Sequence, residues 1–194
     1  MEIDIDKAEL RKWGIIYGII LGVLLSAFSI ISFYVMISTS SVIVISSAPF
    51  VFSVLLPIGA VVLLVINLRK KIGGFWSMRQ AASGIFIMFF TAFVLQFLVR
   101  DMLFAKVVEP NMVQKTQTAM TKAVSTYLTE NKAKPDEVKK KMDDINQQFE
   151  VQKDVTVGRQ ITGFGISIIF MFVLSLIFAA FFKREGVVYN NQPQ

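Results

Sequence analysis

The 194-residue chain is 54% hydrophobic and only 18% charged, whereas soluble domains carry about 25% charged residues, so the composition excludes an ordinary soluble domain. It contains neither cysteine nor histidine, which excludes disulfides, thiolate nucleophiles and the commonest metal ligand. The net charge of +6 comes from basic residues beside hydrophobic runs, so membrane lipids with anionic headgroups are the expected partners, and nucleic acid is not.

The first hydrophobic run, Gly14–Ile37, has no charged residue and is long enough for about 36 Å of helix, which spans a bilayer with some tilt. The segment before it is largely acidic, unlike the start of a cleaved signal peptide, so we expect this span to be retained. Gly14, Gly18, Gly22 and Ser26 recur at every fourth position and form a face that lets a second helix approach closely. Two uses of this face remain open: packing within one helical bundle, or docking against another subunit.

The second span is expected over about residues 49–68. The charge-free segment Ser38–Ala48 reads as a connector at the membrane interface, with Ser47 capping a helix whose first turn holds Pro49. Pro57 should kink this helix and free a backbone carbonyl.

A basic elbow follows the second span. Arg69, Lys70 and Lys71 end the span, and Gly73-Gly74 then predicts a turn at the membrane interface. Two interpretations of the basic cluster remain open: an ordinary orientation signal, or a dedicated site for anionic lipid.

The third helix is predicted over residues 78–108. Ser77 and Gln80 match the capping box at a helix start, and the next strong breaker is Pro110. Such a helix is about 46 Å long and exceeds the thickness of the hydrocarbon core, so its far end should leave the membrane.

Near that far end, Arg100 and Asp101 form an adjacent charged pair, with Gln96 one turn earlier. Neighbours at i and i+1 point in different directions on a helix, so the two charges need not pair with each other. Arg100 is read either as an arginine that reaches the interface, or as a contact to a partner or lipid.

Residues 109–160 form the one water-soluble region, for which we expect a helical hairpin outside the cytoplasm. Pro135 and the acidic residues after it fit the first turn of its second helix. This helix carries a narrow apolar stripe that packs within the hairpin or against a partner helix. The stripe consists of Val138, Met142, Ile145 and Phe149.

The last span is expected from residue 161 to residue 182, within a C-terminal segment 161–194. One of its faces consists of the small residues Gly163, Ser167, Ser175 and Ala179. We expect this face to match the small-residue face of the first span.

Basic residues lie beside the spans at both termini and in the elbow, whereas the Ser38–Ala48 connector has none. The positive-inside rule therefore predicts cytoplasmic termini, a cytoplasmic elbow and a hairpin that faces outward. The fold class is thus a polytopic all-α membrane protein with four transmembrane helices, three of them in the segment 1–108.

No charged residue lies in the middle of a span, and no phosphate-binding loop, zinc-protease motif or hydrolase motif occurs. We therefore expect no catalytic residue, no cofactor and no metal site. The leading hypothesis is a non-catalytic accessory or scaffolding subunit of a larger envelope complex, with other membrane protein subunits as partners. The alternative is a small transporter or channel for an uncharged or lipid-like solute.

Several short motifs agree with this reading in their order and spacing. They are Tyr17–Gly22, Gly73-Gly74-Phe75, Glu109-Pro110, Pro135–Val138 and the closing Leu176–Phe181 before Lys183-Arg184. Together they resemble a bacterial domain-of-unknown-function family of small four-span inner-membrane proteins, with a helical insert between the third and fourth spans. The resemblance implies a fold and an inner-membrane location, and it implies no activity.

Overall fold

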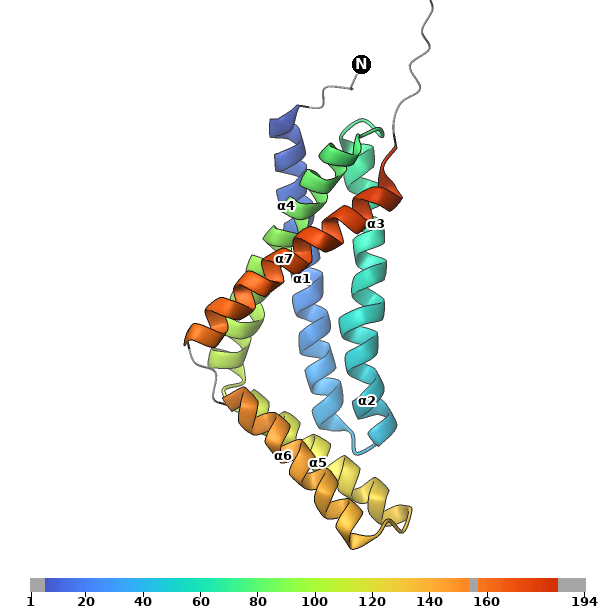
Figure 1. Ribbon diagram of the computed structural model, residues 1–194, viewed down its shortest axis with the longest axis vertical. Helices are drawn as coiled ribbons and strands as arrows, with labels where there is room; N and C mark the ends of the chain where they lie inside the picture. Colours follow the sequence, from blue (N-terminus) through green and yellow to red (C-terminus); the bar gives the residue numbers. More distant parts are fainter. Residues whose placement is uncertain (1–5, 154–156, 185–194) are drawn as a thin grey trace, which may run out of the picture. The chain divides into compact units, whose positions relative to one another are not determined.

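The computed structural model describes residues 6–153 and 157–184, and its regular elements in these ranges are all helices (Figure 1). This confirms the expected all-α fold. Two segments, η1 and η2, are π-helical, which means that their backbone hydrogen bonds reach five residues back instead of four. The elements are α1 (Lys7–Ser38), α2 (Val42–Phe50), η1 (Val51–Leu55), α3 (Leu56–Lys71), α4 (Met78–Gln96), η2 (Phe97–Val108), α5 (Met112–Glu130), α6 (Pro135–Lys153) and α7 (Val157–Phe182).

Four helical stretches in the described ranges are long and apolar enough to cross a membrane, and the protein is a membrane protein. They are Lys7–Ser38, Val42–Lys71, Met78–Val108 and Thr162–Phe182. The third stretch has the expected bounds, whereas the first begins at Lys7 rather than Gly14 and the second at Val42 rather than Pro49. An irregular backbone in lipid would leave polar groups without partners, so helical structure extends through most of the expected connector.

The start of the second span corrects one expectation. Ser41, not Ser47, stands at the N-cap, and Pro49 lies inside α2 rather than in its first turn. The π turn η1 follows, and the amide of Leu56 donates to the carbonyl oxygen of Val51. This wider turn comes directly before Pro57, which cannot donate a backbone hydrogen bond.

The chain forms two compact units. The first unit consists of Met1–Val23, Gly59–Leu95 and Phe164–Gln194. The second consists of Leu24–Ile58 and Gln96–Gly163. These units cut across the expected segments 1–108, 109–160 and 161–194, because the first three spans each contribute to both units.

In the first unit, the small-residue face of α1 packs against α4. A Cβ atom added to Gly18 would lie 2.6 Å from the Cβ atom of Thr91 and 2.7 Å from the carbonyl oxygen of Met88. Similar atoms placed on Gly14 and Gly22 would lie 3.3 and 3.0 Å from backbone carbonyl oxygens of α4. The backbones of α1 and α4 are therefore so close that a side chain larger than that of glycine would clash. Small-residue faces allow this close packing of two helices inside a bundle.

The expected pairing of this face with α7 is wrong. A Cβ atom on Gly163 would meet no described atom within 4 Å, although Ser175 and Ala179 are buried and Ser167 is half-buried. Helix α7 instead packs on α4 through aromatic rings that meet edge to face, a favoured geometry for such pairs. The ring centroids are 6.0 Å apart for Phe86 and Phe172, 5.8 Å for Phe89 and Phe178, and 5.3 Å for Phe93 and Phe164.

The elbow between α3 and α4 has the expected local structure. Gly73 and Gly74 adopt φ angles of 103° and 84°, which favour glycine. The amide of Ser77 donates to Oε1 of Gln80 at 2.8 Å, and the amide of Gln80 donates to Oγ of Ser77 at 3.4 Å. The predicted capping box is confirmed.

In the second unit, α5 and α6 lie side by side and form the predicted helical hairpin (Figure 1). Nε2 of Gln117 on α5 donates to Oδ1 of Asn146 on α6 at 3.0 Å. Ala123, Ile145 and Phe149 are buried, while Val138 and Met142 are half-buried. The apolar stripe is therefore used largely inside the second unit.

Candidate functional site

A pocket of about 560 Å³ lies within the second unit, and it contains the arginine that the sequence singled out. Helices α1, α2, η1, η2, α5 and α6 all contribute to its walls. The polar residues that line it are Ser29, Ser32, Ser46, Ser53, Arg100, Thr116 and Gln148. The apolar ones include Phe33, Met36, Met112, Met120 and Phe149.

Among the described residues, Arg100 is the only charged one that lines this pocket. Its side chain is 40% exposed, yet its Nε atom is buried and has no hydrogen-bond partner in the described part of the chain. Arg100 forms a long ion pair with Asp101, in which Nε lies 4.0 Å from Oδ1, beyond hydrogen-bond range. A buried donor without a hydrogen bond is costly on a cation.

The local backbone around Arg100 is unusual. The π-helix η2 runs through Phe97–Val108, and its end shows the wider spacing, because the amide of Glu109 donates to the carbonyl oxygen of Phe104 at 2.8 Å. Such segments are rare and often lie at functional sites. A π-helix also changes which residues share a face, so an α-helical projection of the sequence does not give the direction of Arg100.

Aromatic packing supports the pocket wall that α1 provides. The ring of Phe33 on α1 lies 5.6 Å from that of Phe104 and 5.2 Å from that of Tyr34, both edge to face. Phe33 and Phe104 are buried. This cluster joins α1 to the same π-helix that carries Arg100, so it holds two walls of the pocket together.

The other residues expected around Arg100 do not line the pocket. Gln96 is the N-cap residue of η2 and Asp101 is exposed. Phe149, from the hairpin stripe, does line it. Sequence reasoning missed the serines as pocket residues, although Ser29 and Ser32 share a helical face by their spacing.

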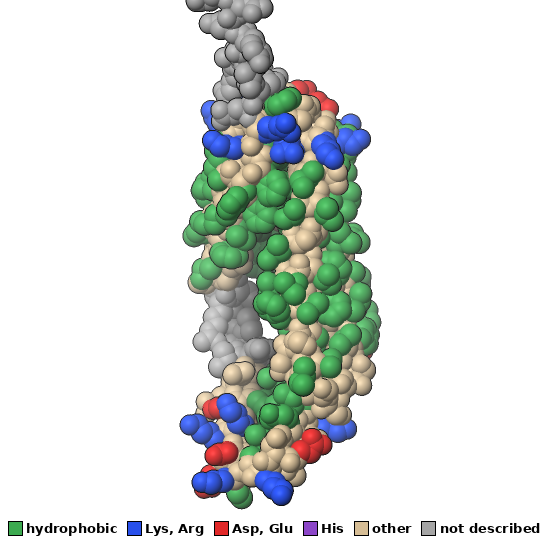
Figure 2. Space-filling view, turned by 90° about the vertical axis from the view of Figure 1, so that its right-hand side faces the viewer, with side chains coloured by type: hydrophobic (Ala, Val, Ile, Leu, Met, Phe, Trp, Pro, Cys, Tyr) green, Lys and Arg blue, Asp and Glu red, His purple; other side chains and the backbone are tan. Residues whose placement is uncertain are grey.

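The basic residues expected as lipid or partner contacts belong to the first unit. Nη1 of Arg69 donates to the carbonyl oxygen of Phe182 at 3.4 Å, and Nζ of Lys71 lies 5.1 Å from the centre of the Trp13 ring. Lys70 lies with them in the last turn of α3. Figure 2 shows the Lys and Arg side chains of this unit gathered at one end. These contacts give Arg69 and Lys71 a role in packing.

A model of the family described as "Protein of unknown function (DUF4199)" matches residues 12–184. Neither a curated protein nor a solved structure matches the chain.

Proposed function

The chain belongs to the DUF4199 family of proteins of unknown function, and from this premise we propose that it is a non-catalytic membrane protein that binds a lipid-like solute with an anionic head. The observation that carries the proposal is the position of Arg100, which is the one charged residue among the described residues that line the serine-rich pocket and whose side chain is 40% exposed. This proposal keeps the lipid-like solute of the second function that the sequence suggested, a small transporter or channel, but it replaces an uncharged solute by one with an anionic head.

The walls of the pocket support an amphiphile as the ligand. Arginine presents a planar fork of donors that matches a carboxylate or a phosphate. Serine hydroxyls supply further hydrogen bonds, while the side chains of Met36, Met112 and Met120 offer adaptable apolar surface. A head with negative charge and an apolar body would satisfy both kinds of wall.

The location and orientation are also proposals. The basic residues of α1, α3 and the end of α7 share one end of the first unit, as the contacts of Lys71 with Trp13 and of Arg69 with Phe182 require. By the positive-inside rule this end is cytoplasmic. The protein then lies in the bacterial inner membrane with both termini in the cytoplasm and the hairpin in the periplasm.

The accessory-subunit hypothesis is a second candidate. Its first expected docking face is filled by α4, and much of the hairpin stripe is used internally. One observation favours it, because Lys139, Lys140 and Lys141 are exposed on α6. A partner that contacts these lysines would be acidic. Charge reversal at these lysines should then release a stoichiometric partner during gentle purification, and a protein that purifies alone at native abundance argues against a complex.

Ligand binding is tested with oleate as the probe and methyl oleate as its uncharged counterpart. The full chain is freed of lipid in detergent, and bound molecules are counted by native mass spectrometry. We expect Arg100→Gln to weaken oleate binding about tenfold, since hydrogen bonds to charged groups are worth about 1.5–3 kcal/mol. Lys106→Gln is the matched control, because Lys106 is an exposed cation on the same π-helix and does not line the pocket.

Two results would contradict the proposal. One is equal binding of oleate and methyl oleate by the unaltered protein. The other is equal loss of oleate in the Arg100 and Lys106 variants, which would indicate a general charge effect.

A further inference from the structure

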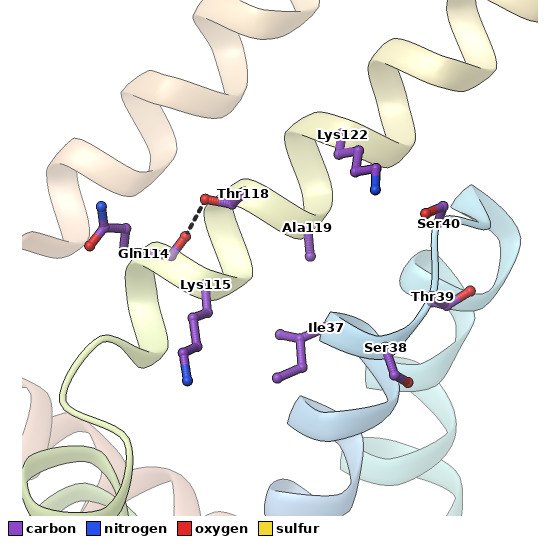
Figure 3. A pocket seen from close by; sticks show the side chains of 9 residues that line it. All are labelled: Ile37, Ser38, Thr39, Ser40, Gln114, Lys115, Thr118, Ala119 and Lys122. Atoms are coloured by element: carbon purple, nitrogen blue, oxygen red, sulfur yellow. Dashed lines mark hydrogen bonds between the residues drawn. The ribbon is translucent and has the colours of Figure 1, made fainter.

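A second pocket of the second unit, also about 560 Å³ in volume, lies between the α1–α2 connector and α5 (Figure 3). The connector contributes Ser38, Thr39 and Ser40, and α5 contributes Lys115 and Lys122. The two lysines are seven residues apart, so they lie on one face of the helix. In Figure 3 both side chains extend from α5 on the side that faces the end of α1.

Neighbouring groups leave this pocket with positive charge. Lys115 forms an ion pair with Glu109, whose other carboxylate oxygen accepts a hydrogen bond of 3.3 Å from the hydroxyl of Tyr34. The Lys115 side chain is nevertheless 47% exposed, and an ammonium group has three donors. Lys122 adds a second cation, so Lys115, Lys122 and Glu109 together carry one positive charge.

Hydrogen bonds order the connector wall of this pocket. The hydroxyl of Ser38 donates to the carbonyl oxygen of Val35 at 3.1 Å, and that of Thr39 accepts from the amide of Ser41 at 3.1 Å. These bonds hold the chain at the end of α1 in place opposite the lysines. The polar wall is therefore built before any ligand arrives.

An open, largely apolar surface of α1 adjoins this pocket and shares two residues with it, Ile37 and Ser38. Its remaining lining residues are Ile31, Tyr34 and Val35. A cationic, hydroxyl-lined pocket is therefore bordered by an apolar surface of a membrane-spanning helix.

We propose that these two adjoining surfaces form a binding site for an anionic phospholipid, separate from the pocket of Arg100. The phosphate of the headgroup binds between Lys115 and Lys122, and one acyl chain lies along Ile31 and Val35. Basic residues at a membrane surface attract anionic headgroups, and a tyrosine such as Tyr34 suits the boundary between headgroup and chain. The site does not depend on the proposed function, since no described residue lines both this site and the Arg100 pocket.

The test uses the full chain in nanodiscs of phosphatidylcholine that contain a minor fraction of phosphatidylglycerol. Native mass spectrometry measures how many phosphatidylglycerol molecules stay bound after release from the nanodisc. We expect Lys122→Gln to lower their apparent affinity about fivefold and Lys115→Gln with Lys122→Gln to lower it further. Lys122→Arg should retain binding, because it keeps the charge.

A matched control comes from the other helix of the hairpin. Lys139 and Lys140 on α6 are exposed and line neither surface, so Lys139→Gln with Lys140→Gln should leave phosphatidylglycerol retention unchanged. Equal loss in both double variants would overturn the site. Thermal unfolding of each variant confirms that the comparison is made on folded protein.

Two further measurements separate a lipid from a free anion. Inorganic phosphate and soluble glycerol phosphate should compete weakly, because neither has an acyl chain to cover the apolar surface of α1. Val35→Asn should weaken phosphatidylglycerol binding, since it places a polar group on that surface. Strong competition by inorganic phosphate, together with no effect of Val35→Asn, would overturn the assignment to a lipid.

Discussion

The indole Nε1 atom of Trp76 donates a hydrogen bond of 2.8 Å to the carbonyl oxygen of Phe182, which joins the elbow before α4 to the last residue of α7. Trp76 is only 1% exposed, and its backbone also pairs with that of Arg184. The last carbonyls of a helix have no partner within the helix, so this contact satisfies one of them. Trp76 thus helps to hold the end of the fourth span against the rest of the first unit.

Trp76→Phe should destabilise the first unit. The substitution keeps an aromatic ring but removes the donor, so the carbonyl of Phe182 retains only the longer bond from Arg69 at 3.4 Å among the described contacts. We expect a loss of about 1–3 kcal/mol in the free energy of unfolding, measured with denaturant in mild detergent. Trp13→Phe is the control, and an equal loss there would show that Trp76 has no special role.

Gly18→Ala should also destabilise, because the added Cβ atom would lie 2.6 Å from that of Thr91. Overpacking of this kind costs about 1–3 kcal/mol. A Cβ atom on Gly59 of α3 would meet no described atom within 4 Å, so Gly59→Ala should be neutral or stabilise the helix by up to about 1 kcal/mol. Thermal unfolding of both variants checks the opposite signs, and equal shifts would argue against close packing of α1 on α4.

Ser77 and Gln80 should act as one unit. Each of Ser77→Ala and Gln80→Ala removes one of the two reciprocal hydrogen bonds, and loss of an N-cap costs about 1 kcal/mol. The double variant should therefore lose less than the sum of the single losses. A double-mutant cycle by denaturant unfolding measures this coupling, and strict additivity would contradict a cooperative capping box.

The proposed orientation can be tested directly because the chain has no cysteine. Lys70→Cys and Lys140→Cys each introduce one thiol at an exposed position. In sealed inverted membrane vesicles, an impermeant maleimide should label the thiol at position 70 and leave the one at position 140 unlabelled until detergent is added. Labelling of both thiols before detergent, with intact vesicles, would disprove the orientation.

Arg100→Met should separate stability from binding. The buried Nε atom has no hydrogen bond among the described residues, and its ion pair with Asp101 is long, so an apolar side chain there should leave the ligand-free protein as stable or slightly more stable. Oleate binding should fall at the same time. A large loss of stability in Arg100→Met, measured against Lys106→Met, would instead indicate that Arg100 is structural.

Local features of this protein were predictable because they depend on neighbours in sequence. The run Gly14–Ile37 makes a spanning helix by its length and apolarity, and Ser77 with Gln80 marks a helix start by side chains that reach only three residues. The same holds for the turn after Glu130 and for the start of α6 at Pro135. The hairpin followed from these local signals.

The contacts between helices that are far apart in the sequence were not predictable in the same way. The small-residue face of α1 fits any helix with an open face, and only the tertiary structure showed that α4 fills it while α7 packs through phenylalanine rings. The pocket of Arg100 likewise contains serines from α1, α2 and η1, which are far apart in the sequence. It also contains part of the π-helix η2, which the periodicity of the sequence does not predict. The sequence alone determined that lipid is the solvent and that the fold is helical, because these depend on the length of apolar runs. The choice of helix partners and of pocket walls required the folded chain, because several faces are nearly equal in composition and only their shapes distinguish them.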